Sequence, residues 1–267
     1  MISRRRFSRV EDALDAIAAG RLVIVVDAEE REDEGDLITA AETITPQKIH
    51  FMISEGRGQV CLPLLPAIAN RLQLRRMATG DSLEAPNFTV PIDHCQCKTG
   101  ISPFERAATI RAVLDPASTA HDFIRPGHMF PLVAREEGVL ARPGHTEASV
   151  DLARLAGLTP AAVLCEICSR DGMYMAGREE LSAMAMRHRL PIITIDDLID
   201  FRRRHTTNGH APAIPSLERN GVVMPAVAPK GLYYRITAHL QQVARSMLSR
   251  SCDPSLAPGV IRAYEGK

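Results

Sequence analysis

The stretch V-I-V-V-D-A-E-E-R-E-D-E-G-D-L-I-T-A-A, residues 23–41, decides how the chain is organised. Apolar runs at its two ends predict two strands that enter a core, with eight charged side chains held between them. Seven of the eight are carboxylates, which repel one another unless a cation binds or a raised pKa removes charge. Because magnesium prefers oxygen ligands, the pattern predicts either a metal-binding loop or a solvated acidic turn.

The size and charge of the chain limit what it can do. Its 267 residues are 45% hydrophobic and 24% charged, which is enough to build one substantial core. Lys and Arg together number 32, as do Asp and Glu, so no net field attracts nucleic acid or an anionic membrane surface. We therefore expect no nucleic acid and no membrane among the partners, and local groups must hold any anionic substrate.

The N-terminal sequence M-I-S-R-R-R-F resembles the start of a twin-arginine export signal. Glu11, Asp12 and Asp15 interrupt the apolar stretch that such a signal needs. No apolar run reaches the roughly 18 residues of a membrane span. We therefore expect a cytoplasmic protein.

Helical and strand patterns alternate along the rest of the chain. Ser102-Pro103 and Thr45-Pro46 each combine an N-cap residue with proline in the first helical position. Residues 70–87 show no regular pattern and predict a loop. The periodicity predicts helices over 10–19, 46–56, 103–113, 145–157, 178–189 and 196–204, and strands over 22–26, 60–64, 88–92, 161–167 and 192–195.

Two P-G-H tripeptides place imidazole groups on tight turns, at His128 and His145. A lone histidine is more often a hydrogen-bonded structural residue than a catalyst. The helix that starts at His145-Thr146 offers free backbone N–H groups and a positive dipole end, near Arg142, which suits a phosphate group. Glutamates and a histidine are plausible ligands for magnesium or manganese, and a second histidine with a carboxylate can supply acid–base chemistry.

Glu166 ends an apolar strand and is expected to be partly removed from water. Burial raises the pKa of a carboxyl group and suits it to proton transfer. The alternative is a salt-bridged residue at the rim of the sheet.

Five motifs in order resemble the 3,4-dihydroxy-2-butanone 4-phosphate synthase family of riboflavin biosynthesis. The similarity covers about residues 6–204, and several long motifs in register are more specific than any single signature. The motifs are R-E-D-E-G-D (31–36), T-G-I-S (99–102), R-P-G-H-M-F-P-L (125–132), R-P-G-H-T-E-A-S-V-D-L (142–152) and C-E-I (165–167).

The resemblance implies a fold and an activity. The fold would be a three-layer α/β/α arrangement around a mixed, twisted β-sheet, in the α+β class. The activity would be that of a lyase, which converts D-ribulose 5-phosphate with magnesium or manganese to L-3,4-dihydroxy-2-butanone 4-phosphate and formate. The family also implies a homodimer with active sites at the subunit interface.

The resemblance also assigns roles to single residues. Glu32 and His145 would bind the metal, and His128 and Glu166 match essential catalytic positions, with Asp36 or Glu166 as the base and His128 as a proton shuttle. A metal that polarises the C2 carbonyl makes the C3 proton acidic, so a nearby base yields an enediolate. The residues implied to contact the substrate are Arg31, Glu32, Asp36, Thr99, Arg142, Thr146 and Glu166, with Arg142 and Thr146 nearest the phosphate.

Several positions depart from the family pattern. Asp33 stands in place of the usual Asn, Lys98 in place of Thr, and Glu105 in place of Asp. Residues 77–87 and 169–178 also differ from the usual loops. These changes leave open a specialised paralogue that acts on another sugar phosphate, since specificity depends on supporting contacts.

The sequence divides into a catalytic domain at 1–204, a linker at 205–230 and a helical tail at 231–267. The linker is rich in Pro, Asn, Gly and Ala. Because the tail is short and contains a single cysteine, we expect it not to form the GTP cyclohydrolase II domain with which many relatives continue. The tail's apolar residues follow helical spacing and could pack on the domain, or bind a partner in a non-catalytic subunit.

Overall fold

The computed structural model describes residues 7–77 and 85–206, all of which belong to one compact unit, Met1–Ile214. The predicted tail and nearly all of the predicted linker lie outside the described residues. The strands are β1 (Val23–Val26), β2 (Gly35–Ala40), β3 (Cys61–Leu64), β4 (Ile92–His94), β5 (Phe123–Val133), β6 (Ala162–Glu166) and β7 (Ile192–Thr194).

The helices that the sequence predicts agree with their predicted ranges to within a few residues. They are α1 (Val10–Ala18), α2 (Pro46–Phe51), α4 (Pro103–Leu114), α5 (His145–Leu155), α6 (Arg178–His188) and α7 (Ile195–Thr206). A short helix that was not predicted, α3 (Pro66–Arg71), begins at a proline. A π-helical turn, η2 (Met52–Gly56), extends α2, and short 3₁₀ turns are η1 (Ala41–Thr43), η3 (Ala120–Asp122) and η4 (Gly138–Leu140). The predicted N-caps are confirmed, because the Thr45 and Ser102 side chains accept hydrogen bonds from the backbone of Lys48 and Glu105.

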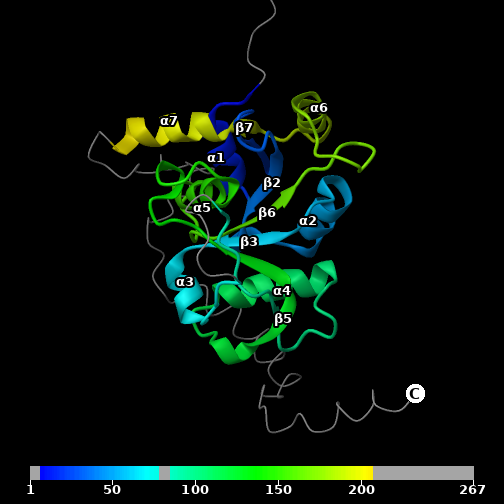
Figure 1. The fold of residues 1–267 in the computed structure, drawn as a ribbon, viewed down its shortest axis with the longest axis vertical. Helices are drawn as coiled ribbons and strands as arrows, with labels where there is room; N and C mark the ends of the chain where they lie inside the picture. Colours follow the sequence, from blue (N-terminus) through cyan, green and yellow to red (C-terminus); the bar gives the residue numbers. More distant parts are fainter. Residues whose placement is uncertain (1–6, 78–84, 207–267) are drawn as a thin grey trace, which may run out of the picture. The chain divides into compact units, whose positions relative to one another are not determined.

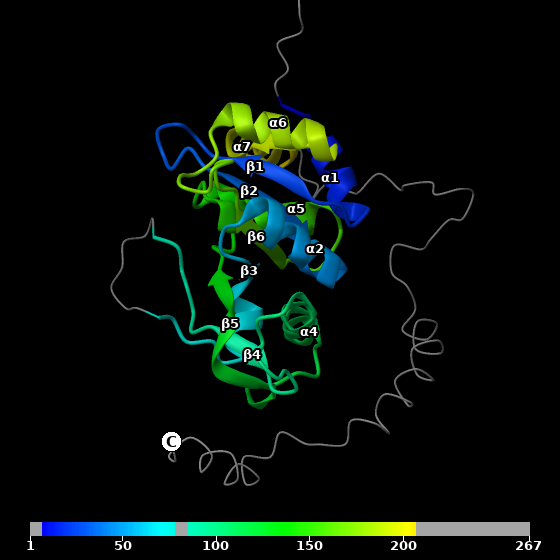
Figure 2. The ribbon, with the colours of Figure 1, turned by 90° about the vertical axis from the view of Figure 1, so that its right-hand side faces the viewer.

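The strands of the described residues form one mixed sheet in the order β4-β5-β3-β6-β2-β1-β7 (Figures 1 and 2). The pairs β1–β7 and β3–β5 are parallel, and the other neighbours are antiparallel. The predicted strand at 88–92 was wrong in position: Pro91, which has no N–H to donate, precedes β4, and residues 88 and 89 make only isolated bridges.

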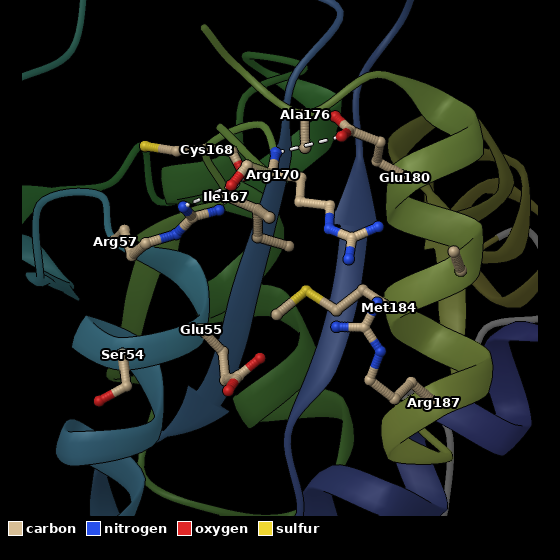
Figure 3. A pocket seen from close by; sticks show the side chains of 11 residues that line it. Ser54, Glu55, Arg57, Ile167, Cys168, Arg170, Ala176, Glu180, Met184 and Arg187 are labelled. Atoms are coloured by element: carbon tan, nitrogen blue, oxygen red, sulfur yellow. Dashed lines mark hydrogen bonds between the residues drawn. The ribbon is translucent and has the colours of Figure 1, made fainter. Parts of the chain in front are cut away.

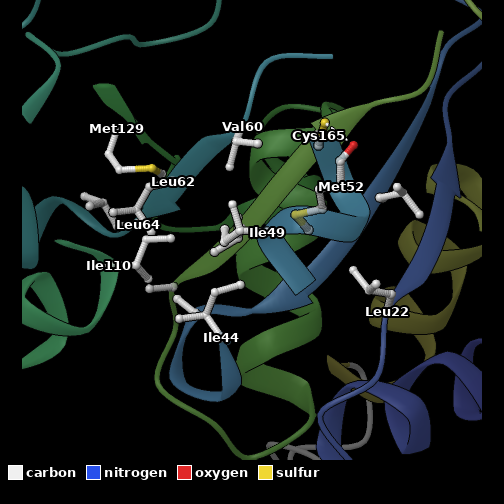
Figure 4. Close-up of a cluster of buried hydrophobic side chains, with 14 of the residues drawn as sticks. Leu22, Ile44, Ile49, Met52, Val60, Leu62, Leu64, Ile110, Met129 and Cys165 are labelled. Atoms are coloured by element: carbon white, nitrogen blue, oxygen red, sulfur yellow. Dashed lines mark hydrogen bonds between the residues drawn. The ribbon is translucent and has the colours of Figure 1, made fainter. Parts of the chain in front are cut away.

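Apolar side chains on the two faces of the sheet form two cores. In β1 the alternation is visible directly, because Ile24 and Val26 join one core while Val23 and Val25 join the other. Helices α2, α4 and α6 cover the first core, whose centre around Ile49 is drawn in Figure 4, and α1, α5 and α7 cover the second. The structure therefore confirms the predicted three-layer α/β/α arrangement of the α+β class.

A buried carboxylate fastens α7 to the domain. Asp151 on α5 has no exposed side-chain surface and lies 2.5 Å from guanidinium nitrogens of both Arg154 and Arg202. It also accepts a hydrogen bond from the backbone of Val139 at 3.0 Å. A Cβ atom at Gly138, where φ is +65°, would lie 2.2 Å from this carboxylate, so the turn requires glycine. The charge of Asp151 is thus neutralised by two cations, one of them on α7.

Candidate active site

The charged stretch of residues 27–34 forms the turn between β1 and β2. Asp27 is the first residue after β1, is buried, and organises this turn by accepting from the backbone N–H of Glu34 at 2.8 Å and of Glu32 at 3.3 Å. Its carboxylate also pairs with Arg31 at 2.7 Å, and the same guanidinium nitrogen lies 2.6 Å from the Glu32 carboxylate. Local hydrogen bonds and Arg31 therefore help to hold the loop in place despite its excess of carboxylates.

A cavity of about 320 Å³ opens beside this turn. It brings together segments that are far apart in the sequence: the acidic turn, the ends of β2 and β6, and the start of α5. Seven of the predicted site residues lie along it. The lining residues are Arg31, Glu32, Glu34, Asp36, Pro86, Phe88, Leu132, Arg142, His145, Thr146, Leu164 and Glu166.

Glu32, His145 and Asp27 converge at one end of the cavity. One potential ligand atom from each lies within 4.8 Å of the others. Opposite ligands of an octahedral magnesium ion are about 4 Å apart, so this spacing is close to what the ion requires. Sequence reasoning selected Glu32 and His145 but missed Asp27. The signal that could have found Asp27 is its position directly after a strand of four buried residues.

Backbone contact sets the protonation of His145. Its Nε2 lies 3.2 Å from the Val25 carbonyl oxygen, which can only accept, so Nε2 carries the proton and donates. Burial lowers the pKa of this imidazole and favours its neutral form. The lone pair of Nδ1 is then available to a cation, in the arrangement typical of metal-binding histidines.

A second acidic pair occupies the sheet beside the cluster. Asp36 on β2 is directly opposite Glu166 on β6. Burial, together with the nearby Glu166 and Glu34 carboxylates, raises the pKa of Asp36 well above its ordinary value. Its Oδ1 is buried and has no hydrogen-bond partner among the described residues. An unpaired carboxylate oxygen at this position fits a site that binds a cation or a substrate hydroxyl group.

The backbone of residues 58–59 positions Glu166. The Gln59 N–H donates to the Glu166 carboxylate at 2.7 Å, and the Gly58 N–H donates to its carbonyl oxygen at 3.2 Å. A Cβ atom at Gly58 would lie 2.6 Å from the Glu166 Oε2 atom, so only glycine permits this approach. The catalytic candidate is therefore held by two neighbouring amides.

The start of α5 also lines the cavity. Gly144 caps the helix, and His145 and Thr146 occupy its first turn, where backbone N–H groups have no partner within the helix. The buried Arg142 guanidinium lies 2.7 Å from the Glu147 carboxylate, which fixes its position. A helix N-terminus and an arginine therefore lie together at the cavity, and the anion site there stays a prediction.

The burial of Asp36 has an expected cost in stability. We expect Asp36→Asn to raise the free energy of unfolding of the metal-free protein by about 1–3 kcal/mol at pH 7, since it removes a buried unpaired charge. Burial raises the pKa of Asp36 in the folded state above its unfolded value, which is near 4. Asp36 therefore contributes most to the stability of the wild type below pH 4, and this stabilisation is lost as the pH rises through the folded-state pKa.

Urea unfolding in a chelator, from pH 4 to 8, measures this difference. The difference in the free energy of unfolding between Asp36→Asn and the wild type should be small at pH 4 and grow with pH. A gap that stays constant over this range would show that Asp36 is not the titrating group.

Arg178 connects α6 to the acidic turn. Its Nε lies 3.0 Å from the Asp33 carboxylate and 3.1 Å from that of Glu29, and its Nη2 donates to the Asp27 carbonyl oxygen at 3.0 Å. Asp33, which replaces the usual Asn, has a positive φ of 53°. Its carboxylate forms an ion pair with Arg178. The departure at Asp33 is thus compensated by an ion pair that sequence analysis did not anticipate.

We expect Arg178→Gln to weaken magnesium binding about tenfold or more, because supporting contacts of this kind usually contribute 10- to 100-fold to metal affinity. The measurement is the magnesium concentration that gives half-maximal activity. Arg178→Lys should recover part of the loss, and Arg75→Gln, at an exposed arginine elsewhere, serves as the control. Unchanged magnesium dependence in Arg178→Gln would contradict the role assigned to this residue.

His128 and Thr99 do not line the cavity of the same chain. The His128 Nδ1 lies 2.7 Å from the Asp93 carboxylate, which also accepts from the His128 backbone at 2.9 Å. The imidazole remains about half exposed, at 45% of its side-chain surface. An aspartate that orients a histidine and leaves its other nitrogen accessible is typical of acid–base sites. Sequence analysis missed Asp93, which no motif marked.

Glu105 holds the Thr99 loop. Its carboxylate accepts from the Thr99 hydroxyl at 2.9 Å, from the Ser102 hydroxyl at 2.9 Å and from the Lys98 N–H at 2.6 Å. The Thr99 hydroxyl and backbone bonds are the leading causes that lower the pKa of Glu105 to about 2. Glutamate in place of the usual aspartate therefore still fixes this loop.

The described part of the chain has no helix that is both long and apolar enough to pass through a membrane.

Comparison with known proteins agrees with this geometry. The family model described as 3,4-dihydroxy-2-butanone 4-phosphate synthase matches residues 11–201. A Bacillus cereus (strain AH187) protein named riboflavin biosynthesis protein RibBA is 53% identical over 202 residues, which is 75% of this chain and 51% of that protein. The 3,4-dihydroxy-2-butanone 4-phosphate synthase of Wolinella succinogenes is 48% identical over 199 residues, 74% of this chain and 57% of that protein.

Solved structures show the same fold. A crystal structure of 3,4-dihydroxy-2-butanone 4-phosphate synthase in complex with two magnesium ions aligns with a TM-score of 0.70 at 37% identity, and covers 75% of this chain and 99% of that chain. The chain belongs to the 3,4-dihydroxy-2-butanone 4-phosphate synthase family. It spans about half the length of the curated relatives that it matches.

Proposed function

We propose that this protein converts D-ribulose 5-phosphate to L-3,4-dihydroxy-2-butanone 4-phosphate and formate, as a magnesium-dependent lyase of riboflavin biosynthesis. The observation that carries the proposal is the cluster of Asp27, Glu32 and His145. Glu32 and His145 of this cluster line a cavity together with Asp36 and Glu166. The solved relative with two magnesium ions supports the choice of metal. Manganese, which accepts the same ligand types, is the expected substitute.

The cavity supplies the groups that this reaction needs. Glu32 and His145, with Asp27, would hold the metal, and bound magnesium would polarise the substrate carbonyl and its neighbouring hydroxyl groups. Arg142, Thr146 and the first N–H groups of α5 would bind the phosphate. The sugar would then lie between the helix start and the carboxylates of Asp36 and Glu166. Either carboxylate, once deprotonated, can remove the C3 proton, and Arg31 and Thr99 complete the proposed substrate contacts.

We also propose a homodimer in which each active site takes His128 and Thr99 from the partner subunit. Support comes from their placement, since neither lines the cavity of its own chain while His128 is half exposed and oriented by Asp93. A partner's His128 next to Asp36 and Glu166 would provide the proton shuttle. The proposed substrate is a phosphorylated sugar of central metabolism, which fits a cytoplasmic location.

A formate assay tests the proposed activity. Purified protein mixed with ribulose 5-phosphate and magnesium should release one formate for each sugar consumed, and a chelator should stop the release until excess magnesium is added. Xylulose 5-phosphate and ribose 5-phosphate serve as control substrates and should give no formate. If ribulose 5-phosphate is not consumed in the presence of magnesium, the proposed reaction is wrong.

A further inference from the structure

A second cavity, of about 310 Å³, lies between the η2 turn and α6 (Figure 3). It is on the other face of the sheet from the proposed active site. Leu164 and Glu166 line the active-site cavity, whereas the next residue, Ile167, lines this cleft and packs in the opposite core. Adjacent residues of an extended segment point to opposite faces, so the two cavities are separate.

Three arginines make this cleft basic. The side chains of Arg57, Arg170 and Arg187 line it, and Figure 3 shows the guanidinium groups of Arg170 and Arg187 directed into the space between the η2 turn and α6. Arg57 is fixed because its guanidinium donates to the carbonyl oxygens of residues 168, 169 and 170 at 2.6–3.2 Å. Within residues 7–77 and 85–206, the guanidinium groups of Arg170 and Arg187 make no hydrogen bond or ion pair.

Among the described residues, the two acidic side chains of the cleft form no ion pair with these arginines. Glu180 accepts from the Arg170 backbone N–H at 3.1 Å, and the Glu55 carboxylate lies 3.2 Å from the His188 imidazole. Three guanidinium groups against two carboxylates leave a net formal charge of about +1, and so a positive potential, in a concave site. Arginine forks match phosphate oxygens in a bidentate manner, so the complementary ligand is a phosphate group.

The rest of the lining indicates what the phosphate is attached to. Apolar atoms of Ile167 and Ala176, and of Ala183 and Met184 on α6, also line the cleft and can contact a carbon chain. The carboxylates of Glu55 and Glu180 at the rim retain acceptor capacity for hydroxyl groups. A volume of about 310 Å³ is at the lower end of the usual range for small-molecule sites.

We propose that this cleft binds a small phosphorylated polyhydroxy compound, with its phosphate between Arg170 and Arg187 and close to Arg57. The site is independent of the proposed catalytic reaction and uses none of its residues. Its occupant meets the protein at the η2 turn, at the segment after β6 and at α6.

Calorimetric titration of the full chain with sorbitol 6-phosphate, in a chelator to remove metal, tests the proposal. We expect the double variant Arg170→Gln/Arg187→Gln to lose one binding site per chain, or at least tenfold in affinity at that site. Arg111→Gln, at an exposed arginine of α4, is the matched control and should titrate like wild type. Sorbitol, which lacks the phosphate, should not bind.

A second variant separates loss of fit from loss of charge. Ala183→Phe keeps every arginine but fills the cleft from an exposed position on α6, and it should also remove the site. Thermal unfolding of each variant verifies that it is folded. Equal binding by wild type and by both folded cleft variants would overturn the proposal, as would an equal loss in Arg111→Gln, which would indicate a general effect of charge.

Discussion

Glu32→Gln and His145→Ala should each lower the rate of formate release by about 10³-fold or more, the largest single-site effects that we expect. Each change would remove one of the proposed metal ligands from the cluster formed with Asp27. A factor of 10³ equals about 4 kcal/mol of transition-state stabilisation, within what a bound metal ion contributes to such reactions. The measurement is the initial rate of formate release at saturating magnesium, with magnesium affinity determined by titration calorimetry.

Glu30→Gln is the control for this experiment. Glu30 lies in the same acidic turn and is exposed, so its loss changes the local charge equally without removing a ligand. Its rate should stay within about twofold of wild type, because surface charges contribute little. If folded Glu32→Gln protein keeps more than a tenth of the wild-type rate, Glu32 is not a ligand that the metal requires.

Mixing two inactive variants should restore activity if each site takes residues from both subunits. His128→Ala and Glu32→Gln alone should be almost inactive. After subunit exchange, half of the dimers are mixed, and each mixed dimer contains one site with both residues intact, so about a quarter of the wild-type rate should return. The rise from near zero to a quarter is measured by formate release before and after exchange.

A second mixture serves as the control. Glu32→Gln and His145→Ala affect the same part of the site, since both residues line one cavity within one chain. Mixed dimers of this pair contain no intact site, so activity should remain near zero. Recovery in the control pair, or none in the His128→Ala pair after demonstrated exchange, would contradict the proposed composite site.

Local patterns in the sequence predicted most of the fold. The cap signals at Thr45 and Ser102 and the apolar runs set the element boundaries to within a few residues. The sequence also placed Glu32, Asp36, His145 and residues near them in one site through their motifs, and the cavity brings them together. Short-range signals succeed here because capping, periodicity and turn chemistry act over only a few residues.

Contacts between distant segments explain what could not be predicted. Arg178 reaches the acidic turn from 145 positions after Asp33, and nothing near either residue in the sequence indicates the pair. Asp93 orients His128 across two neighbouring strands, and its role depends on their register. Asp27 belongs to a charged stretch that is evident in the sequence. Only its burial distinguishes it from exposed neighbours such as Glu30, and burial is not evident from the sequence. These functions arise from tertiary packing, which a single sequence does not display.

The buried carboxylate of Asp151 affects how the domain can be joined to other protein segments. Because Arg202 near the end of α7 is anchored to it, the polypeptide leaves this domain from a firmly attached point. Sequences appended after α7 therefore do not need to contribute to the domain's integrity. Gene fusions or exchanges at this exit should be tolerated, which suits a domain that matches only about half the length of its curated relatives.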